Sequence, residues 1–258
     1  MEQGIGTGRL GLGRVLSVGW REYCRHFRSI LPIVLIVYIP INIGLSFVPV
    51  DALIEQHGLR GFRMYMKVVQ LSEFLIGVLA TLSIAKLVEA GFLGQSCTWR
   101  QAFHHAFSRW GTAIVSGMLG GVIVLGMFLL LIVPGIIWSL YYSFFLYVVA
   151  LRGLSGKAAL DYSKSLVKGQ WWRVFGYLLV INVLGFLAGA LLAVPFIFTP
   201  ENRVLDILSD TLTDIVAALF LVMTVVFFLN SDAIRVRSKE PPALPESPEI
   251  PPEAAPQA

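Results

Sequence analysis

Few residues in this chain have the types and spacing that catalysis or metal binding requires. Gly6-Thr-Gly-Arg-Leu-Gly11 has the letters of a dinucleotide-binding loop. No strand precedes it and no strand–helix–strand unit surrounds it, so a flexible arm is the better interpretation. His104 and His105 are adjacent and point to different faces of a helix, and adding Cys97 gives no recognisable ligand geometry. The sequence therefore predicts no catalytic residue, no metal site and no cofactor.

Polar side chains inside long apolar runs are stronger candidates, because a polar group at membrane depth is costly and usually has a partner or a function. Glu73 lies near one end of its run, where we expect it to snorkel to the surface, with a functional role as the alternative. Asn42 and Asn182 lie deeper, and hydrogen bonds between helices are expected for both. Lys86 and Glu89 are three residues apart and should form an ion pair.

One apolar run is unusually rich in hydroxyl groups. It contains Tyr141 and Tyr142, together with Ser139, Ser143 and Tyr147. Lipid offers these hydroxyl groups no hydrogen-bond partner. We therefore expect this run to face protein or a cavity.

The elements that position these residues are membrane-spanning helices. The 258-residue chain is 56% hydrophobic and only 14% charged, whereas soluble domains carry about 25% charged residues. This excludes most soluble enzymes, disulfide scaffolds and disordered proteins. Because backbone groups in lipid must be satisfied internally and a span needs about 20 apolar residues, the apolar runs predict helices. There are six such runs: Ile30–Val50, Val68–Gly91, Thr112–Val133, Pro134–Leu151, Val174–Phe198 and Thr211–Asn230. The third and fourth are separated only by the turn expected at Pro134-Gly135.

The distribution of Lys and Arg predicts the orientation. With the N-terminus inside, sixteen of the 20 Lys and Arg residues fall on the inner side, and only Arg60, Arg63, Lys67 and Arg203 fall outside. This asymmetry is typical of the positive-inside rule. It predicts that both termini are cytoplasmic.

Small and charged residues also predict how the helices pack. Gly185, Gly189 and Ala193 are four residues apart, and Ser116, Gly117, Gly120 and Gly121 cluster in the third span. Such spacings let helix backbones approach closely, within one chain or in a homodimer. On the outer side, a basic stripe and an acidic stripe could form ion pairs that clamp the first hairpin to the third, or the acidic stripe could attract cations. The stripes are Arg60, Arg63 and Lys67, and Asp206, Asp210 and Asp214.

An amphipathic segment precedes the first, third and fifth spans, which predicts three repeats of an interfacial helix plus a helical hairpin. In the first segment, Leu12, Leu16, Trp20, Tyr23 and Phe27 form an apolar face. Basic residues in and after such segments could be mere topology determinants or could bind anionic lipid headgroups. The lipid-headgroup candidates are Arg14, Arg21, Arg25, Arg28, Lys157, Lys164, Lys168 and Arg173.

Three stretches resemble a known family. They are Val133-Pro-Gly-Ile-Ile-Trp138, residues 156–176 and residues 18–29. They are similar to the membrane domain of bacterial glycerophosphodiester phosphodiesterases and to related uncharacterised stand-alone multi-pass proteins. The resemblance implies a six-span fold in a bacterial cytoplasmic membrane. It implies no diesterase activity, since the catalytic barrel would need about 250 further residues.

The chain is thus expected to be an all-α integral membrane protein in three parts. Residues 1–29 form a glycine-rich cytoplasmic arm and amphipathic helix, residues 30–235 the six-helix domain, and residues 236–258 a disordered Pro- and Glu-rich tail. The leading hypothesis is a non-enzymatic inner-membrane protein that binds or organises anionic inner-leaflet lipid or holds a protein partner, with no nucleic-acid role. The alternative is a transporter of small solutes or lipid, against which stands the lack of an evident broken helix pair.

Overall fold

The computed structural model describes residues 9–198 and 202–239, and every element within these ranges is helical. Residues 6–8 of the glycine-rich run and residues 240–258 of the predicted tail lie outside the described residues. Six helical stretches are long and apolar enough to span a membrane. The elements are α1 (Leu12–Ser46), α2 (Val50–His57), α3 (Leu59–Ser72), η1 (Glu73–Gly77), α4 (Val78–Phe92), α5 (Trp99–Leu130), α6 (Ile132–Tyr141), α7 (Phe145–Arg152), α8 (Gly156–Val167), α9 (Trp171–Ile197) and α10 (Arg203–Lys239).

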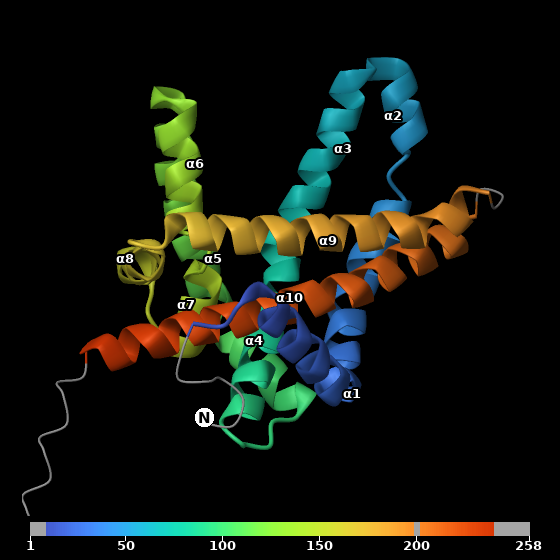
Figure 1. The fold of residues 1–258 in the computed structure, drawn as a ribbon. Coiled ribbons are helices and arrows are strands. Elements are labelled where there is room, and N and C mark those ends of the chain that lie inside the picture. Colours follow the sequence, from blue (N-terminus) through green and yellow to red (C-terminus); the bar gives the residue numbers. More distant parts are fainter. Residues whose placement is uncertain (1–8, 199–201, 240–258) are drawn as a thin grey trace, which may run out of the picture.

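The amphipathic segments and the spans are less separate than the sequence suggests. In the first two repeats, the amphipathic segment and the span form one continuous helix, α1 and α5, and only the third has a separate helix, α8. A helix of 35 residues such as α1 is long enough to cover both parts. It contains Pro32 and Pro40, which weaken the backbone ladder and favour a bend. Figure 1 shows the dark blue first part of α1 at a steep angle to its lighter blue second part.

The predicted apolar face of α1 is wrong in detail. Trp20 is 57% exposed and Phe27 is 37% exposed. The buried face is instead made by Val15, Val18 and Gly19, together with Glu22 and Tyr23. This face packs against α10, where a Cβ atom added to Gly19 would lie 3.0 Å from the Met223 Cα atom. The close backbone approach at Gly19 selects the face that turns inward.

The hairpin between the third and fourth spans turns three residues earlier than predicted, at Leu131 and not at Pro134-Gly135. Leu131 has an extended backbone and separates α5 from α6. Pro134 and Gly135 lie inside α6 instead, where a proline in the first turn removes no needed hydrogen bond. A Cβ atom on Gly135 would collide with the Phe128 ring, so glycine permits the two helices to lie close together.

Two spans contain irregular backbone, which overturns the expectation that no broken helix is present. The fourth span is divided into α6 and α7 by a turn at Tyr142, Ser143 and Phe144. The second span contains the π-helical stretch η1, which begins at Glu73. Irregular helix geometry at membrane depth often marks a functional position, and it requires partners for the displaced backbone groups.

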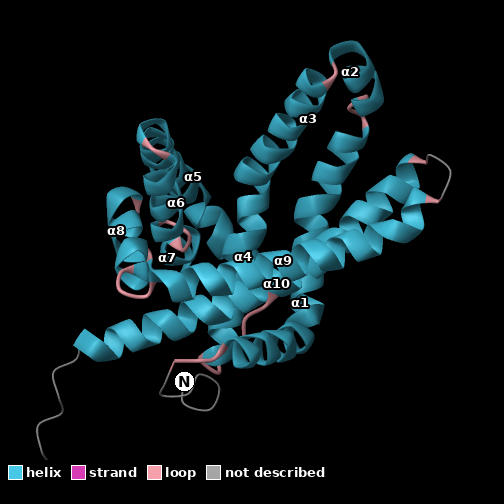
Figure 2. Cartoon of the chain, turned by 45° about the horizontal axis from the view of Figure 1, so that its top comes forward, coloured by secondary structure: helices cyan, strands magenta, loops and turns pink. Residues whose placement is uncertain are grey.

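The molecule consists of three helical hairpins that spread from a shared core (Figures 1 and 2). One hairpin contains the second part of α1 with α2 and α3, another is α5 with α6, and the third is α9 with α10. The third crosses the others at a steep angle in both views. The core is built from buried side chains of several helices, mainly α1, α4, α7 and α10, and in it the ring centroid of Phe144, just before α7, is 5.9 Å from those of Phe227 and Phe228.

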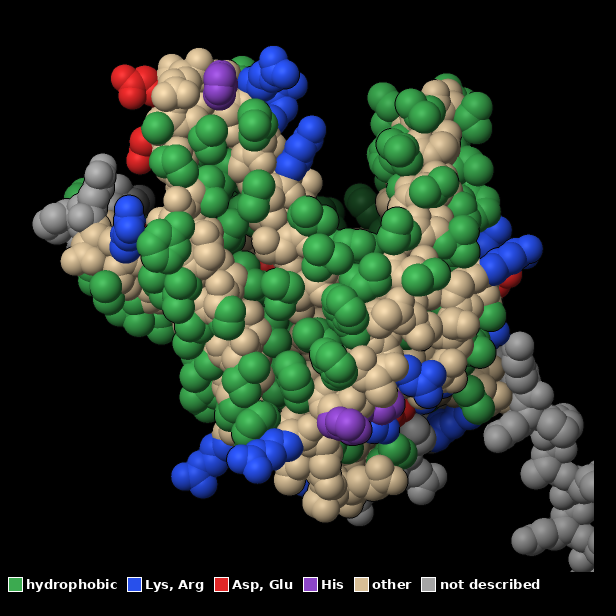
Figure 3. Space-filling view, turned by 180° about the vertical axis from the view of Figure 1, so that it is seen from behind, with side chains coloured by type: hydrophobic (Ala, Val, Ile, Leu, Met, Phe, Trp, Pro, Cys, Tyr) green, Lys and Arg blue, Asp and Glu red, His purple; other side chains and the backbone are tan. Residues whose placement is uncertain are grey.

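Large apolar side chains remain exposed along the hairpins. Leu129 is 81% exposed at the turn between α5 and α6, and Phe186 on α9 is 75% exposed. Figure 3 shows apolar side chains covering much of one face, with Lys and Arg largely toward its edges and a notch between two of the hairpins. Such an extensive apolar surface is typical of a protein solvated by lipid.

Candidate functional site

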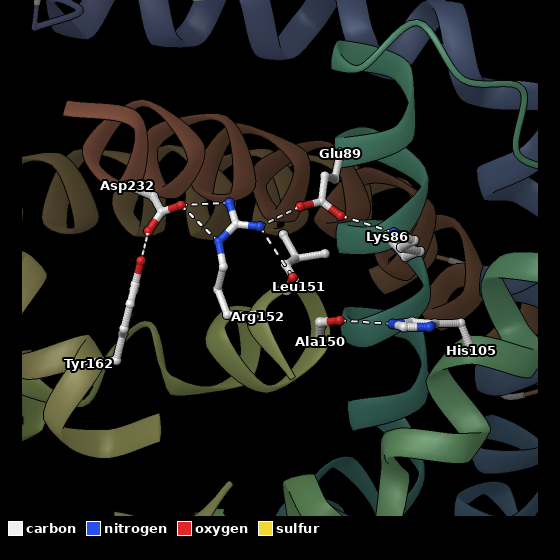
Figure 4. Close-up of polar contacts among 8 residues, drawn as sticks. All are labelled: Lys86, Glu89, His105, Ala150, Leu151, Arg152, Tyr162 and Asp232. Atoms are coloured by element: carbon white, nitrogen blue, oxygen red, sulfur yellow. Dashed lines mark hydrogen bonds and ion pairs between the residues drawn. The ribbon is translucent and has the colours of Figure 1, made fainter. Parts of the chain in front are cut away.

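The strongest polar constellation is a charged network that joins α4, α7, α8 and α10 (Figure 4). Arg152, the last residue of α7, donates to Asp232 on α10 through Nε at 2.9 Å and Nη2 at 2.6 Å. Its Nη1 donates to Glu89 on α4 at 2.8 Å, and Lys86 Nζ donates to the other oxygen of Glu89 at 3.1 Å. Tyr162 on α8 donates its hydroxyl to Asp232. The predicted Lys86–Glu89 ion pair is therefore confirmed.

Burial makes this network a structural tie. The side chains of Asp232 and Glu89 are only 2% and 7% exposed, while that of Arg152 is 27% exposed. Buried carboxylates need cations and hydrogen-bond donors, and here every carboxylate oxygen has one. Burial and the hydrogen bond to Asp232 raise the pKa of Tyr162, which keeps its proton in place. All four carboxylate oxygens of Glu89 and Asp232 are thus engaged within the network.

A second polar cluster lies at the far end of α10, where its first turns meet α1. Asn42, which is buried, donates to Asp214 at 2.8 Å and to Thr211 at 3.3 Å. The expected hydrogen bond between helices is thus present at Asn42. Glu73 lies beside this cluster, near Tyr38 and Asp214. Glu73 itself is exposed.

Asn182 does not make the expected bond between helices. It is exposed on α9 and donates to the Leu178 carbonyl of its own helix at 2.7 Å. It lines a cavity of about 600 Å³ between α7, α9 and α10, beside the break in the fourth span. The expectation that the fourth span faces protein or a cavity is met by two of its residues, Ser143 and Tyr147.

Tyr141 and Tyr142 belong to the break in the fourth span. Ser163 on α8 donates its hydroxyl to the Tyr141 carbonyl at 2.7 Å and accepts from the Phe144 N–H at 3.2 Å. One serine thus partners a carbonyl on one side of the break and an amide on the other. Tyr142 is 7% exposed, and the Trp138 ring lies edge-on to it. The backbone of the break is therefore bonded to α8, and neither tyrosine is among the residues that line the cavity.

The eight basic candidates separate into two groups. Lys164 lies over the Trp138 ring, with Nζ 4.1 Å from the centroid. Arg173 donates to the Leu10 carbonyl at 3.0 Å and lies over the rings of Tyr177 and Phe227. These two cations are engaged within the protein. The other six are exposed: Arg14, Arg21, Arg25, Arg28, Lys157 and Lys168.

The predicted clamp between the outer basic and acidic stripes is wrong. Arg60, Arg63 and Lys67 are exposed on α3, and none of them forms an ion pair with an acidic residue of α10 in the described part of the chain. The hairpins diverge beyond their shared core (Figure 2), and the basic side chains of α3 stay exposed instead of pairing with α10. Asp214 pairs with Asn42 instead, and Asp206 and Asp210 line a surface pocket with Tyr65 and Arg203.

Cys97 and the two neighbouring histidines do not converge. His105 contacts the Ala150 carbonyl through Nε2 at 2.8 Å, while His104 is exposed. Partial burial raises the pKa of the Cys97 thiol, and nearby Lys86 opposes this shift. Within residues 9–198 and 202–239, no group of three or more His, Cys, Asp or Glu side chains could hold a metal ion.

Sequence reasoning missed Arg152, Asp232 and Ser163. Arg152 and Asp232 are 80 residues apart, so no local spacing could pair them. The available signal was that each charge stands at the end of a long apolar run, where it has to find a partner or reach water.

Six apolar helices, a buried ionic tie and a broken span define a multi-pass helical protein of the membrane type. The chain belongs to a family described as a domain of unknown function, DUF7847, which matches residues 29–235. No curated protein and no solved structure matches the chain. Nothing in the family match links the chain to the membrane domains of glycerophosphodiester phosphodiesterases.

Proposed function

We propose that the protein is a non-enzymatic inner-membrane protein that binds anionic lipid through the outward face of α1. The observation that carries this proposal is the exposure of Arg14, Arg21, Arg25 and Arg28 along one helix. The opposite face of α1 is fixed against α10 at Val15, Val18 and Gly19. The four guanidinium groups are therefore held outward, with no partner residue competing for them among the described ion pairs.

Aromatic side chains beside these arginines support a position at the headgroup level. Trp20, at 57% exposed, and the partly exposed Phe27 lie on the part of α1 that carries the four arginines. A helix with basic and aromatic side chains exposed together is typical of the membrane interface, where aromatic rings enter the headgroup region and cations attract anionic lipid. Each such cation contributes about 1 kcal/mol of attraction.

The proposed orientation places both termini in the cytoplasm. Residues that the Lys and Arg distribution assigns to the cytoplasmic side lie close together in the structure, which supports this orientation. Leu10 donates to Asn230 at 3.2 Å, and Arg152 pairs with Asp232 two residues further on. We also propose that the membrane is the bacterial inner membrane and that the protein binds a protein partner or a second copy of itself. A relationship to the membrane domains of diesterases is likewise a proposal.

The proposal is tested by counting the lipids that the purified protein retains. A variant with Arg14, Arg21, Arg25 and Arg28 all changed to Gln should bind phosphatidylglycerol about 1,000-fold more weakly, at about 1 kcal/mol per cation. Native mass spectrometry of protein released from its own membrane measures the retained lipid. The matched control changes Arg60, Arg63 and Lys67 to Gln, since these are exposed cations on α3, away from the proposed surface. Unchanged phosphatidylglycerol retention in the α1 variant would overturn the proposal.

Lipid transport is the second candidate, because a cavity lies beside a broken span. Discontinuous helices next to a polar cavity are common at substrate sites of transporters. Reconstituted protein that moves fluorescent phospholipid between leaflets faster than protein-free vesicles would favour transport. Vesicles that scramble lipid at the protein-free rate would remove this candidate and leave binding alone.

A further inference from the structure

The cavity between α7, α9 and α10 contains hydrogen-bond donors that have no acceptor among the described residues. Its volume of about 600 Å³ is in the range of small-molecule sites. Its lining comes from the turn that breaks the fourth span and from three helices. The lining residues are Ser143, Tyr147, Leu178, Ile181, Asn182, Gly185, Phe186, Thr213, Ala217, Phe220, Leu221 and Thr224.

Tyr147 is the residue that points to a ligand. Its side chain is buried at 6% exposure, and its ring packs against Phe228 with centroids 5.5 Å apart. Its hydroxyl has no hydrogen-bond partner among the described residues. The hydroxyl is not one of the fully enclosed polar atoms that lack a partner, so it is open to the cavity that Tyr147 lines. Tyrosine hydroxyl groups in an apolar environment usually have a hydrogen-bond partner. A ligand in the cavity would supply the missing acceptor.

The other polar groups of the lining leave one further donor. Ser143, Thr213 and Thr224 each donate to a carbonyl of the backbone three or four residues earlier. Asn182 donates one N–H to Leu178 and has a second, because its amide carries two. The cavity therefore offers an O–H and an N–H to a hydrogen-bond acceptor.

The ligand should be neutral and mostly apolar. No Lys, Arg, His, Asp or Glu lines the cavity, so a carboxylate, a phosphate or an amine would be left without a countercharge. The walls include Ile181, Phe186 and Phe220. Helix α9 has only 6% of its apolar window buried and so faces lipid along most of its length. Molecules in the surrounding lipid are the ones that can enter from this side.

We propose that this cavity binds the ester region of a glycerolipid, with an ester carbonyl accepting from Tyr147 and an acyl chain against Ile181 and Phe186. Ester carbonyl oxygens are strong acceptors that carry no net charge, which matches the two donors and the uncharged lining. The shared chemistry could come from free diacylglycerol or from the glycerol backbone of a phospholipid whose headgroup stays outside. This site is separate from the basic face of α1.

The test compares an ester lipid with an ether lipid of the same chain length, which lacks the carbonyl. Dioleoylglycerol should bind the purified protein about fivefold more tightly than its dialkyl ether analogue, the effect expected from one hydrogen bond. Tyr147→Phe should remove this preference while leaving ether-lipid binding unchanged. Tyr142→Phe is the matched control, because Tyr142 is equally buried but does not line the cavity. Native mass spectrometry titrations measure the affinity of both lipids for all three proteins.

A second variant keeps the proposal open to refutation if Tyr147→Phe does not fold. Ala217 is exposed within the lining, so Ala217→Phe should fill the cavity without a clash and lower binding of both lipids by tenfold or more. Equal affinity for ester and ether lipids in the unmodified protein, or unchanged binding in Ala217→Phe, would overturn the proposal. If phosphatidylethanolamine binds as tightly as dioleoylglycerol, the natural ligand is a phospholipid. If dioleoylglycerol binds more tightly, the natural ligand is a free neutral lipid. Loss of phosphatidylglycerol retention through the α1 arginines is measured separately, so either proposal can fail alone.

Discussion

Arg152 neutralises two carboxylates that come from different helices. Its planar guanidinium presents several donors in fixed directions, and this lets one side chain engage Asp232 and Glu89 at once. A lysine has a single ammonium group and could not reproduce the two-nitrogen contact with Asp232. Arg152 is therefore the residue on which the tie between α4, α7 and α10 depends.

Removing this cation should destabilise the protein strongly. Arg152→Met leaves Asp232 as a buried carboxylate with no ion-pair partner, so we expect a loss of about 3–5 kcal/mol in unfolding free energy. Unfolding in detergent, followed during titration with SDS, measures the change. The double variant Arg152→Met with Asp232→Leu should recover part of the loss, because the unpaired charge is gone. A single variant as stable as the unmodified protein would contradict this account.

The thiol of Cys97 should react slowly near neutral pH. Burial raises its pKa above that of an ordinary thiol, so less of the reactive thiolate is present at pH 7 than in the unfolded chain. In a Cys24→Ser variant, maleimide should label folded protein more slowly than SDS-unfolded protein. The difference should narrow as the pH rises past the folded pKa, where both forms are thiolate. Equal labelling rates at pH 7 would show that the thiol is not shielded.

At the scale of elements, α8 holds the fourth span in its broken form. Ser163→Ala should leave the Phe144 N–H and the Tyr141 carbonyl without this partner, at a cost of about 1–3 kcal/mol. The melting temperature in detergent measures this effect. Ser165→Ala is the matched control on the same helix, since Ser165 bonds only the Tyr162 carbonyl of α8. A similar loss in both variants would mean that the serine does not support the break.

The contact between α1 and α10 should be the packing site most sensitive to volume. A Cβ atom on Gly19 would lie 2.5 Å from Met223 Cγ and 3.0 Å from its Cα, so Gly19→Leu should cost about 1–3 kcal/mol or more. Gly189→Leu should cost less, because the nearest atom there is a methyl group of Thr213 at 3.3 Å. Gly121 has nothing within 4 Å and provides a neutral control. The order of melting temperatures tests this ranking.

Composition and periodicity were sufficient for the helices but not for their interruptions. Apolar length predicts six spans because lipid allows little else. The small-residue spacing predicted close packing at Gly185 and Gly189, and the structure shows that side chains of α10 lie there. The break at Tyr142–Phe144 depends on a serine some 20 residues later in the sequence. No local pattern contains that partner, so the fourth span reads as continuous. The same limit hid Arg152 and Asp232, which complete each other only after α7 and α10 have packed.

At the scale of the molecule, three hairpins spread from one core and carry most of the exposed apolar surface (Figures 1 and 3). Spread hairpins leave room between helices for lipid, which fits both the basic face of α1 and the cavity beside α9. The outer stripes do not pair, since Asp214 bonds to Asn42 and the cations of α3 remain exposed. Side-chain chemistry alone does not reveal the angle between hairpins.

The predicted topology can be checked with the two native cysteines. Cys24 and Cys97 should both be protected from a membrane-impermeant maleimide in intact spheroplasts and labelled in inverted vesicles. A cysteine introduced at Glu55, which is exposed on α2, should show the opposite pattern. SDS-unfolded protein gives the maximum labelling for each site. Labelling of Cys24 and Glu55→Cys from the same side would contradict the assignment.

The position of Leu10 has a consequence for the order of assembly during synthesis. Leu10 is 1% exposed and bonds to Asn230, Arg173 and Tyr177, and its partner Asn230 is 220 residues further along the chain. At about 5–20 residues per second, a ribosome needs about 10–45 seconds to make that interval. The first segment of the chain therefore has to wait, exposed, until the last span emerges. This segment therefore docks only after α10 has been made, and a factor that binds the undocked segment would distinguish chains in which α10 is not yet in place.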